Sequence, residues 1–80
     1  MVYKDIYLIK DLARKTGLSV YTIKYYLNLG LIREIGRSPE TNFRYFDNST
    51  VGDLERIISY KRENFSLDKI SSILKEEKVK

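Results

Sequence analysis

Residues 9–30 read IKDLARKTGLSVYTIKYYLNLG, two short stretches of helical hydrophobic spacing with a tight turn between them. The first stretch ends at Gly17, a residue type that commonly terminates helices, and it predicts a helix over about 10–16. Ser19 is a good N-cap for the second stretch, which predicts a helix over about 20–28. Two short helices joined by a glycine-containing turn have the size of a helix-turn-helix.

The segment that follows, about 31–46, has the pattern of a small β-hairpin, or wing. A polar turn cluster at 36–42 separates two short apolar runs. We expect Phe43 and Phe46 to pack in the core. Tyr45 alternates with them along the predicted strand, so we expect its side chain to face outward.

Helical spacing returns over about 50–75. An apolar stripe predicts a third helix over about 50–63, and Ser66 can cap a fourth helix that ends near Lys75. The resulting fold class is mainly α, a winged helix-turn-helix with about four helices and a small β-hairpin wing.

The length and composition of the chain narrow the classes of function. With 80 residues there is room for one core, so we expect a single domain, 1–80, whose helix-turn-helix spans about 9–29. The absence of Cys and His excludes disulfides, the usual zinc ligand sets and histidine acid–base catalysis. We therefore expect no enzyme, no metal and no cofactor. No apolar run approaches the roughly 18 residues of a membrane span, which predicts no membrane partner and a cytoplasmic, nucleoid-associated location.

Positive charge is concentrated in the first half of the chain. The formal net charge is +4, and the isoelectric point is about 9.4. Residues 10–46 contain 7 basic and 3 acidic side chains, whereas residues 47–80 contain 7 of each. This asymmetry predicts that a phosphate-binding surface lies in the first half.

Six segments appear in the order and spacing of the MerR-type winged helix-turn-helix regulators, which the chain resembles over about residues 7–74. They are YLIKDLA at 7–13, TGLS at 16–19, TIKYY at 22–26, GLI at 30–32, FRYF at 43–46 and FSLDKI at 65–70. The resemblance implies a dimer-forming family of transcriptional regulators in which the second helix enters the major groove and the wing contacts the DNA backbone. Many members activate promoters by distorting the spacer.

The chain departs from this family at several positions. Lys24 stands where the family usually has Arg, which keeps the charge but loses the bidentate fork. Asn42 and Asn64 stand where the family commonly has Gly, and Asn tolerates a left-handed backbone better than most residues. The family's long dimerisation helix and effector domain are absent from this sequence. We therefore expect a monomer in isolation, dimeric only on DNA, and no small-molecule effector site within the chain.

The candidate DNA contacts come from the outward face of the second helix and from the wing. They are Ser19, Tyr21, Thr22, Lys24, Tyr25, Tyr26, Arg37, Asn42, Arg44 and Tyr45, with Arg33 and Lys61 as additional backbone contacts. Two alternatives stay open at this point. Either Tyr25 or Tyr26 could pack its ring into the domain. The wing arginines could instead pair with Glu34 or Glu40.

The function predicted from these features is sequence-specific binding of double-stranded DNA in transcriptional regulation. A first alternative is an excisionase-like or architectural DNA-binding factor, because such factors can be short winged helices without effector domains. A second alternative is a protein-interaction module that has kept the fold and lost DNA binding.

Overall fold

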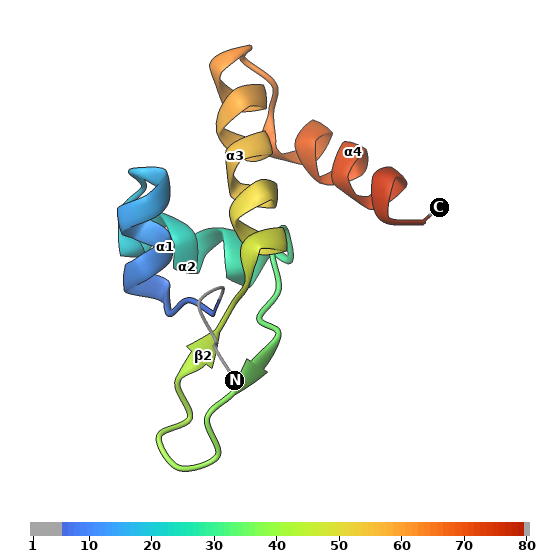
Figure 1. The fold of residues 1–80 in the computed structure, drawn as a ribbon. Coiled ribbons are helices and arrows are strands. Elements are labelled where there is room, and N and C mark those ends of the chain that lie inside the picture. The colour runs from blue at the N-terminus through green and yellow to red at the C-terminus, as the bar shows by residue number, and fades with distance from the viewer. Residues whose placement is uncertain (1–5, 80) are drawn as a thin grey trace.

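The computed structural model of the protein describes residues 6–79, with side chains described as far as Glu76. Over these residues, helices surround one core and a short hairpin projects from one end of them (Figure 1). The elements are α1 (Ile9–Thr16), α2 (Val20–Leu29), β1 (Gly36–Arg37), β2 (Arg44–Tyr45), α3 (Asn48–Arg62) and α4 (Leu67–Val79). The mainly α winged helix-turn-helix is confirmed.

Local interactions set the bounds of the helix-turn-helix. The Ser19 hydroxyl oxygen accepts a hydrogen bond from the Thr22 backbone N–H at 3.0 Å and so caps the start of α2. Gly17 and Gly30 end α1 and α2 in the left-handed conformation, at φ 80° and 82°. This conformation costs glycine little, because it has no Cβ.

The wing is an antiparallel pair in which Gly36 lies opposite Tyr45 and Arg37 lies opposite Arg44. The chain just before α1 continues this pairing. Tyr7 and Phe46 exchange two backbone hydrogen bonds of 2.7 Å each. The hairpin is therefore tied to the helix-turn-helix at its base, while its turn extends beyond the helices (Figure 1).

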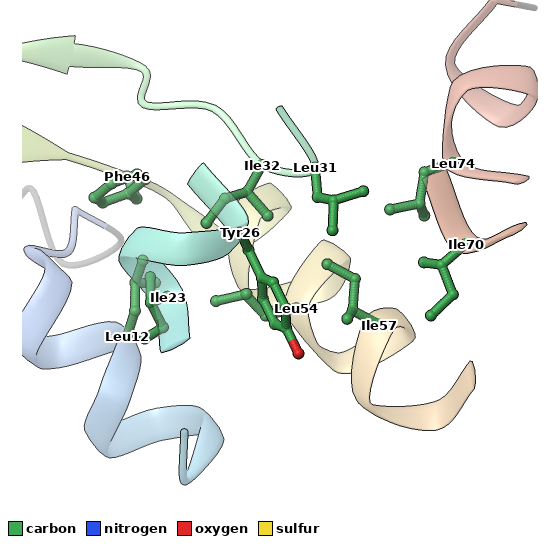
Figure 2. Packing of buried hydrophobic residues seen from close by; sticks show 10 residues of the cluster. All are labelled: Leu12, Ile23, Tyr26, Leu31, Ile32, Phe46, Leu54, Ile57, Ile70 and Leu74. Carbon is green, nitrogen blue, oxygen red and sulfur yellow. The ribbon is translucent and has the colours of Figure 1, made fainter. Parts of the chain in front are cut away.

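One continuous core joins the helices. Its buried hydrophobic residues are Leu12, Ile23, Tyr26, Leu31, Ile32, Phe46, Leu54, Ile57, Ile70 and Leu74. Figure 2 shows that the cluster runs from the helix-turn-helix side, where Leu12 and Ile23 lie, to α4 at the other end. The apolar stripes expected from the helical spacing thus face one another, and α3 packs against both α1 and α4.

Three expectations about the fold are corrected. Phe43 is 61% exposed instead of buried. Because side chains alternate along an extended segment, residues three apart cannot share a face, and the core takes Phe46. Helix α3 begins at Asn48, since the Asp47 carboxylate caps it by accepting from the Ser49 N–H at 3.0 Å. Helix α4 continues to Val79, past the predicted end.

Within residues 6–79, none of the helices is both long and apolar enough to cross a bilayer.

Candidate nucleic-acid interface

Helix α2 presents a polar and aromatic stripe on its outer face. Tyr21 is 83% exposed and Tyr25 is 49% exposed. Lys24, also exposed, lies within one helical turn of both. Ile23 is fully buried on the opposite face of the helix, so the core fixes the direction in which this stripe points.

Tyr26 does not belong to that stripe, which corrects its assignment as a DNA contact. It follows Ile23 by three residues, so it lies on the inward face of α2, and only 7% of it is exposed. Its ring lies in the core beside Leu54 (Figure 2). Burial, with a smaller contribution from the neighbouring Tyr25, raises the pKa of the Tyr26 hydroxyl. Of the two alternatives left open for the tyrosines, the structure selects packing of Tyr26.

A hollow of about 420 Å³ lies between the start of α1, helix α2 and the wing. Its lining combines apolar surface with three cationic side chains. The lining residues are Leu8, Ile9, Lys10, Lys24, Asn42, Phe43 and Arg44. Lys24 of α2 and two predicted residues of the wing, Asn42 and Arg44, therefore meet in one place. The hollow also includes Lys10 and Phe43, which the sequence analysis did not place at the interface.

The arginines of the wing share one carboxylate. Arg37 Nε lies 2.6 Å from Glu34 Oε2, and Arg44 Nε lies 2.8 Å from Glu34 Oε1. The hydrogen bond from Arg37 lowers the pKa of Glu34, and the charges of Arg37 and Arg44 lower it further against the effect of desolvation. The sequence left two roles open for these arginines, binding to phosphates or pairing with a nearby carboxylate. In the free protein they pair with a carboxylate. The partner is Glu34, while Glu40 is exposed.

Several candidate residues also have a structural role. Ser19 donates its hydroxyl to Thr22 Oγ1 at 2.9 Å, in addition to capping α2. Asn42 adopts φ 62°, and its N–H donates to the Ser38 carbonyl at 2.8 Å to close the wing turn. Asn64, between α3 and α4, adopts φ 68°. Both positions therefore have the left-handed backbone that favours Gly and that Asn tolerates better than most other residues.

Tyr45, Arg33 and Lys61 are among the candidates that lie outside the lining of the hollow. Tyr45 is half-buried, and its ring covers Gly36 on the facing strand, where an added Cβ would lie 3.1 Å from the Tyr45 Cζ. Arg33 is exposed in the segment between α2 and β1. Lys61 is exposed near the end of α3, roughly 20 Å along the helix from its start beside the wing. The structure therefore leaves Lys61 apart from the other candidates.

No three His, Cys, Asp or Glu side chains gather as a metal site among the residues that the structure describes.

Comparison with known proteins gives matches over nearly the whole chain. The family described as "MerR HTH family regulatory protein" matches residues 7–77. The HTH-type transcriptional regulator CueR of Bacillus subtilis is 34% identical over 82 residues, which cover 96% of this chain and 56% of that protein. The mercuric resistance operon regulatory protein of Bacillus cereus is 38% identical over 66 residues, covering 82% of this chain and 49% of that protein. The chain thus spans about half the length of these curated relatives.

Solved structures of similar proteins share the fold. A MerR-family transcriptional regulator from Bacillus cereus superposes with a TM-score of 0.80 at 25% identity, over 86% of this chain and 51% of that one. HiNmlR, a MerR-family regulator lacking the sensor domain and solved bound to promoter DNA, superposes with a TM-score of 0.82 at 26% identity, over 92% of this chain and 55% of that one. Together with the family match and the geometry of the wing and helix-turn-helix, these likenesses establish that the chain belongs to the MerR HTH family of regulatory proteins.

Proposed function

We propose that this chain binds double-stranded DNA in a sequence-specific manner and acts in transcriptional regulation. The observation that carries the proposal is the hollow in which cations from three elements meet: Lys10 at the start of α1, Lys24 on α2 and Arg44 on the wing. Lys24 also belongs to the exposed stripe of α2, so the hollow and the stripe form one surface. A cationic surface of this kind attracts the phosphate backbone of a duplex.

Each part of the surface has its own role in the proposal. Helix α2 enters the major groove, where Tyr21 and Tyr25 lie against sugars or thymine methyl groups and their hydroxyls donate to phosphates. Lys24 approaches as a point charge, either to a guanine edge or to a phosphate. The wing follows the backbone, and Arg37 and Arg44 bind phosphates there. Arg33 and Lys61 are secondary backbone contacts.

Two further observations support DNA as the partner. All of the net positive charge lies in the half of the chain that contains α2 and the wing. The solved relative HiNmlR, which lacks a sensor domain, carries this fold and is bound to promoter DNA. By analogy we place this chain on promoter DNA in the nucleoid of the cytoplasm.

The proposal includes the assembly of the protein. We expect a monomer when DNA is absent, because Ile70 and Leu74 of α4 are already buried in the core and leave little apolar surface for a partner. Two copies would then come together only on DNA, at neighbouring half-sites. We also expect no effector site within these 80 residues. Sedimentation equilibrium at tens of micromolar tests this expectation, and a stable dimer without DNA would contradict it.

The main test is selection of duplexes from a random pool, followed by fluorescence anisotropy with the enriched sequence. We expect one motif to be enriched, and log K to fall with log salt with a slope of roughly −4 to −5 if about 4 to 6 phosphates are neutralised. Salt-dependent binding without enrichment would favour an architectural factor. Protection at the attachment end of a mobile element would favour an excisionase-like factor. A slope near zero would refute DNA binding and favour a protein-interaction module.

A further inference from the structure

Glu34 occupies a central position among the charges of the wing. Its carboxylate accepts two hydrogen bonds from Arg37, from Nε to Oε2 at 2.6 Å and from Nη2 to Oε1 at 3.5 Å, and Oε1 also lies 2.8 Å from Arg44 Nε. Arg37 and Arg44 are directly opposed in the two strands, so one carboxylate beside the hairpin reaches both. Among the described residues, Glu34 is the only acidic residue that forms a salt bridge with Arg37 or Arg44.

The carboxylate contacts a donor on Arg44 that DNA cannot use. The Nε atom of Arg44 exposes less than 1 Å² to solvent and forms no hydrogen bond with any described residue, so its contact with Glu34 Oε1 at 2.8 Å is an ion pair. The side chain as a whole is 36% exposed. A phosphate arriving from solvent therefore meets the terminal nitrogens of Arg44 and not its Nε. Pairing with Glu34 neutralises the buried edge of the guanidinium and leaves the terminal nitrogens as donors.

Two opposing effects on DNA binding follow from this arrangement. A carboxylate beside the wing repels phosphates, and this repulsion reduces affinity. Holding two long side chains in place removes an ordering cost that binding would otherwise carry, worth about 3- to 10-fold in affinity for each side chain. The Glu34 side chain is 28% exposed, and a phosphate bound to the wing arginines would lie within the Debye length of about 8 Å, so physiological salt screens the repulsion only in part. Glu34 strengthens binding only if the ordering effect exceeds the repulsion that remains, and the affinity of Glu34→Gln measures that difference.

We infer that Glu34 is a positioning residue of this interface, which holds Arg37 by hydrogen bonds and Arg44 by an ion pair in the orientation that binds DNA phosphates. The inference rests on the proposed function and deepens it. An acidic residue in a basic wing thereby strengthens binding to an anion.

The test compares two variants that remove the same charge from the wing. Glu34→Gln removes the shared carboxylate, while Glu40→Gln removes an exposed one that forms no salt bridge with any described residue. The probe is a fluorescein-labelled duplex carrying the selected motif, titrated by anisotropy at physiological salt. We expect Glu34→Gln to bind about 3- to 10-fold more weakly than Glu40→Gln.

A double-mutant cycle separates positioning from a general structural effect. If Glu34 acts through the arginines, Glu34→Gln should no longer weaken binding in a chain that already carries Arg37→Ala and Arg44→Ala. Circular dichroism melts establish that each variant is folded. Should Glu34→Gln fail to fold, Glu34→Asp keeps the charge and shortens the reach, and it should bind more weakly than the wild-type chain.

The outcomes distinguish the inference from the function on which it rests. Weaker binding by Glu34→Gln that disappears in the arginine-free background supports positioning. Binding by folded Glu34→Gln as tight as that of Glu40→Gln, or tighter, overturns the inference and leaves the proposed function intact; for Glu34→Asp, binding equal to wild type or tighter has the same meaning. Failure of the wild-type chain to bind any duplex overturns both.

Discussion

Helix α2 and the wing contribute side chains to the same hollow, but they are held in place in different ways. Helix α2 is anchored in the core by Ile23 and Tyr26, and glycine and serine define its ends. The wing is held by the pairing of β1 with β2, the Tyr7–Phe46 bridge at its base and the carboxylate of Glu34. We therefore expect a substitution on the buried face of α2 to reduce stability and one on its exposed face to reduce DNA binding. A substitution in the wing should act mainly on DNA binding.

The largest effect should come from removing an anchor of α2. Ile23→Ala leaves a cavity in the core, so we expect the free energy of unfolding to fall by about 2 to 5 kcal/mol. Phe43→Ala, the matched change on the exposed wing, should alter it by less than about 0.5 kcal/mol. Urea denaturation followed by circular dichroism measures both. Equal losses for the two variants would show that the wing is as deeply anchored as α2.

The next effect concerns how the two regions recognise DNA. Tyr21→Ala or Lys24→Ala should change the discrimination between the selected duplex and a random one by about 1 to 3 kcal/mol, if the side chain reads a base. Arg44→Ala should weaken binding to both duplexes similarly and reduce the salt slope by about one. Anisotropy titrations over a range of salt concentrations provide both quantities. An unchanged ratio of the two affinities in the α2 variants would mean that α2 does not read the sequence.

A smaller effect separates the end of α2 from the turn of the wing. Gly30→Ala places a Cβ on a left-handed residue at φ 82°, which should cost about 1 to 2 kcal/mol of stability. Asn42→Gly, at φ 62°, relieves the same constraint in the wing but adds freedom to the unfolded chain, so we expect a change within about 0.5 kcal/mol. Thermal melts compare the two. A stable Gly30→Ala chain would show that α2 can end without a left-handed residue.

The smallest effect is the pH dependence that Glu34 confers. Because its pKa in the folded protein lies below the ordinary value of 4.5, ionised Glu34 stabilises the fold above that pH. This contribution is lost as the pH falls through the lowered pKa. As the pH falls below 4.5, the Tm of the wild-type chain should therefore fall more steeply than that of Glu34→Gln. Asp47 also has a lowered pKa, but it is present in both chains, so its contribution to the pH dependence cancels in the comparison. Parallel curves would contradict a stabilising role for the Glu34 pairs.

Much of the candidate interface could be predicted from the sequence, because its α2 half follows helical periodicity. Tyr21 and Lys24 were expected on the outer face of α2, and both are exposed. The wing half was predicted less well. Phe43 was assigned to the core, and Lys10 was not recognised as its neighbour in the hollow. The exposure of Phe43 could have been predicted, because it lies three residues from Phe46 and such residues face opposite sides of an extended segment.

The sequence by itself determined the elements and the ends of α1 and α2. Ser19 caps α2, Gly17 and Gly30 terminate helices, and Asn42 takes the left-handed turn, because each of these effects depends on residues a few positions away in the chain. The overall fold followed, since the apolar stripes of these helices could be buried only against one another.

Only the tertiary structure decided how completely Tyr26 is covered and which carboxylate the wing arginines share. Helical spacing places Tyr26 on the same face of α2 as Ile23, and it is covered because this face joins the buried cluster that includes Leu54 of α3. Glu34 rather than Glu40 binds both arginines because the strand register sets Arg37 opposite Arg44 on the hairpin. Arg37 lies only three residues from Glu34 along the chain, but Arg44 reaches the same carboxylate only through the pairing of the hairpin, which local sequence spacing does not specify.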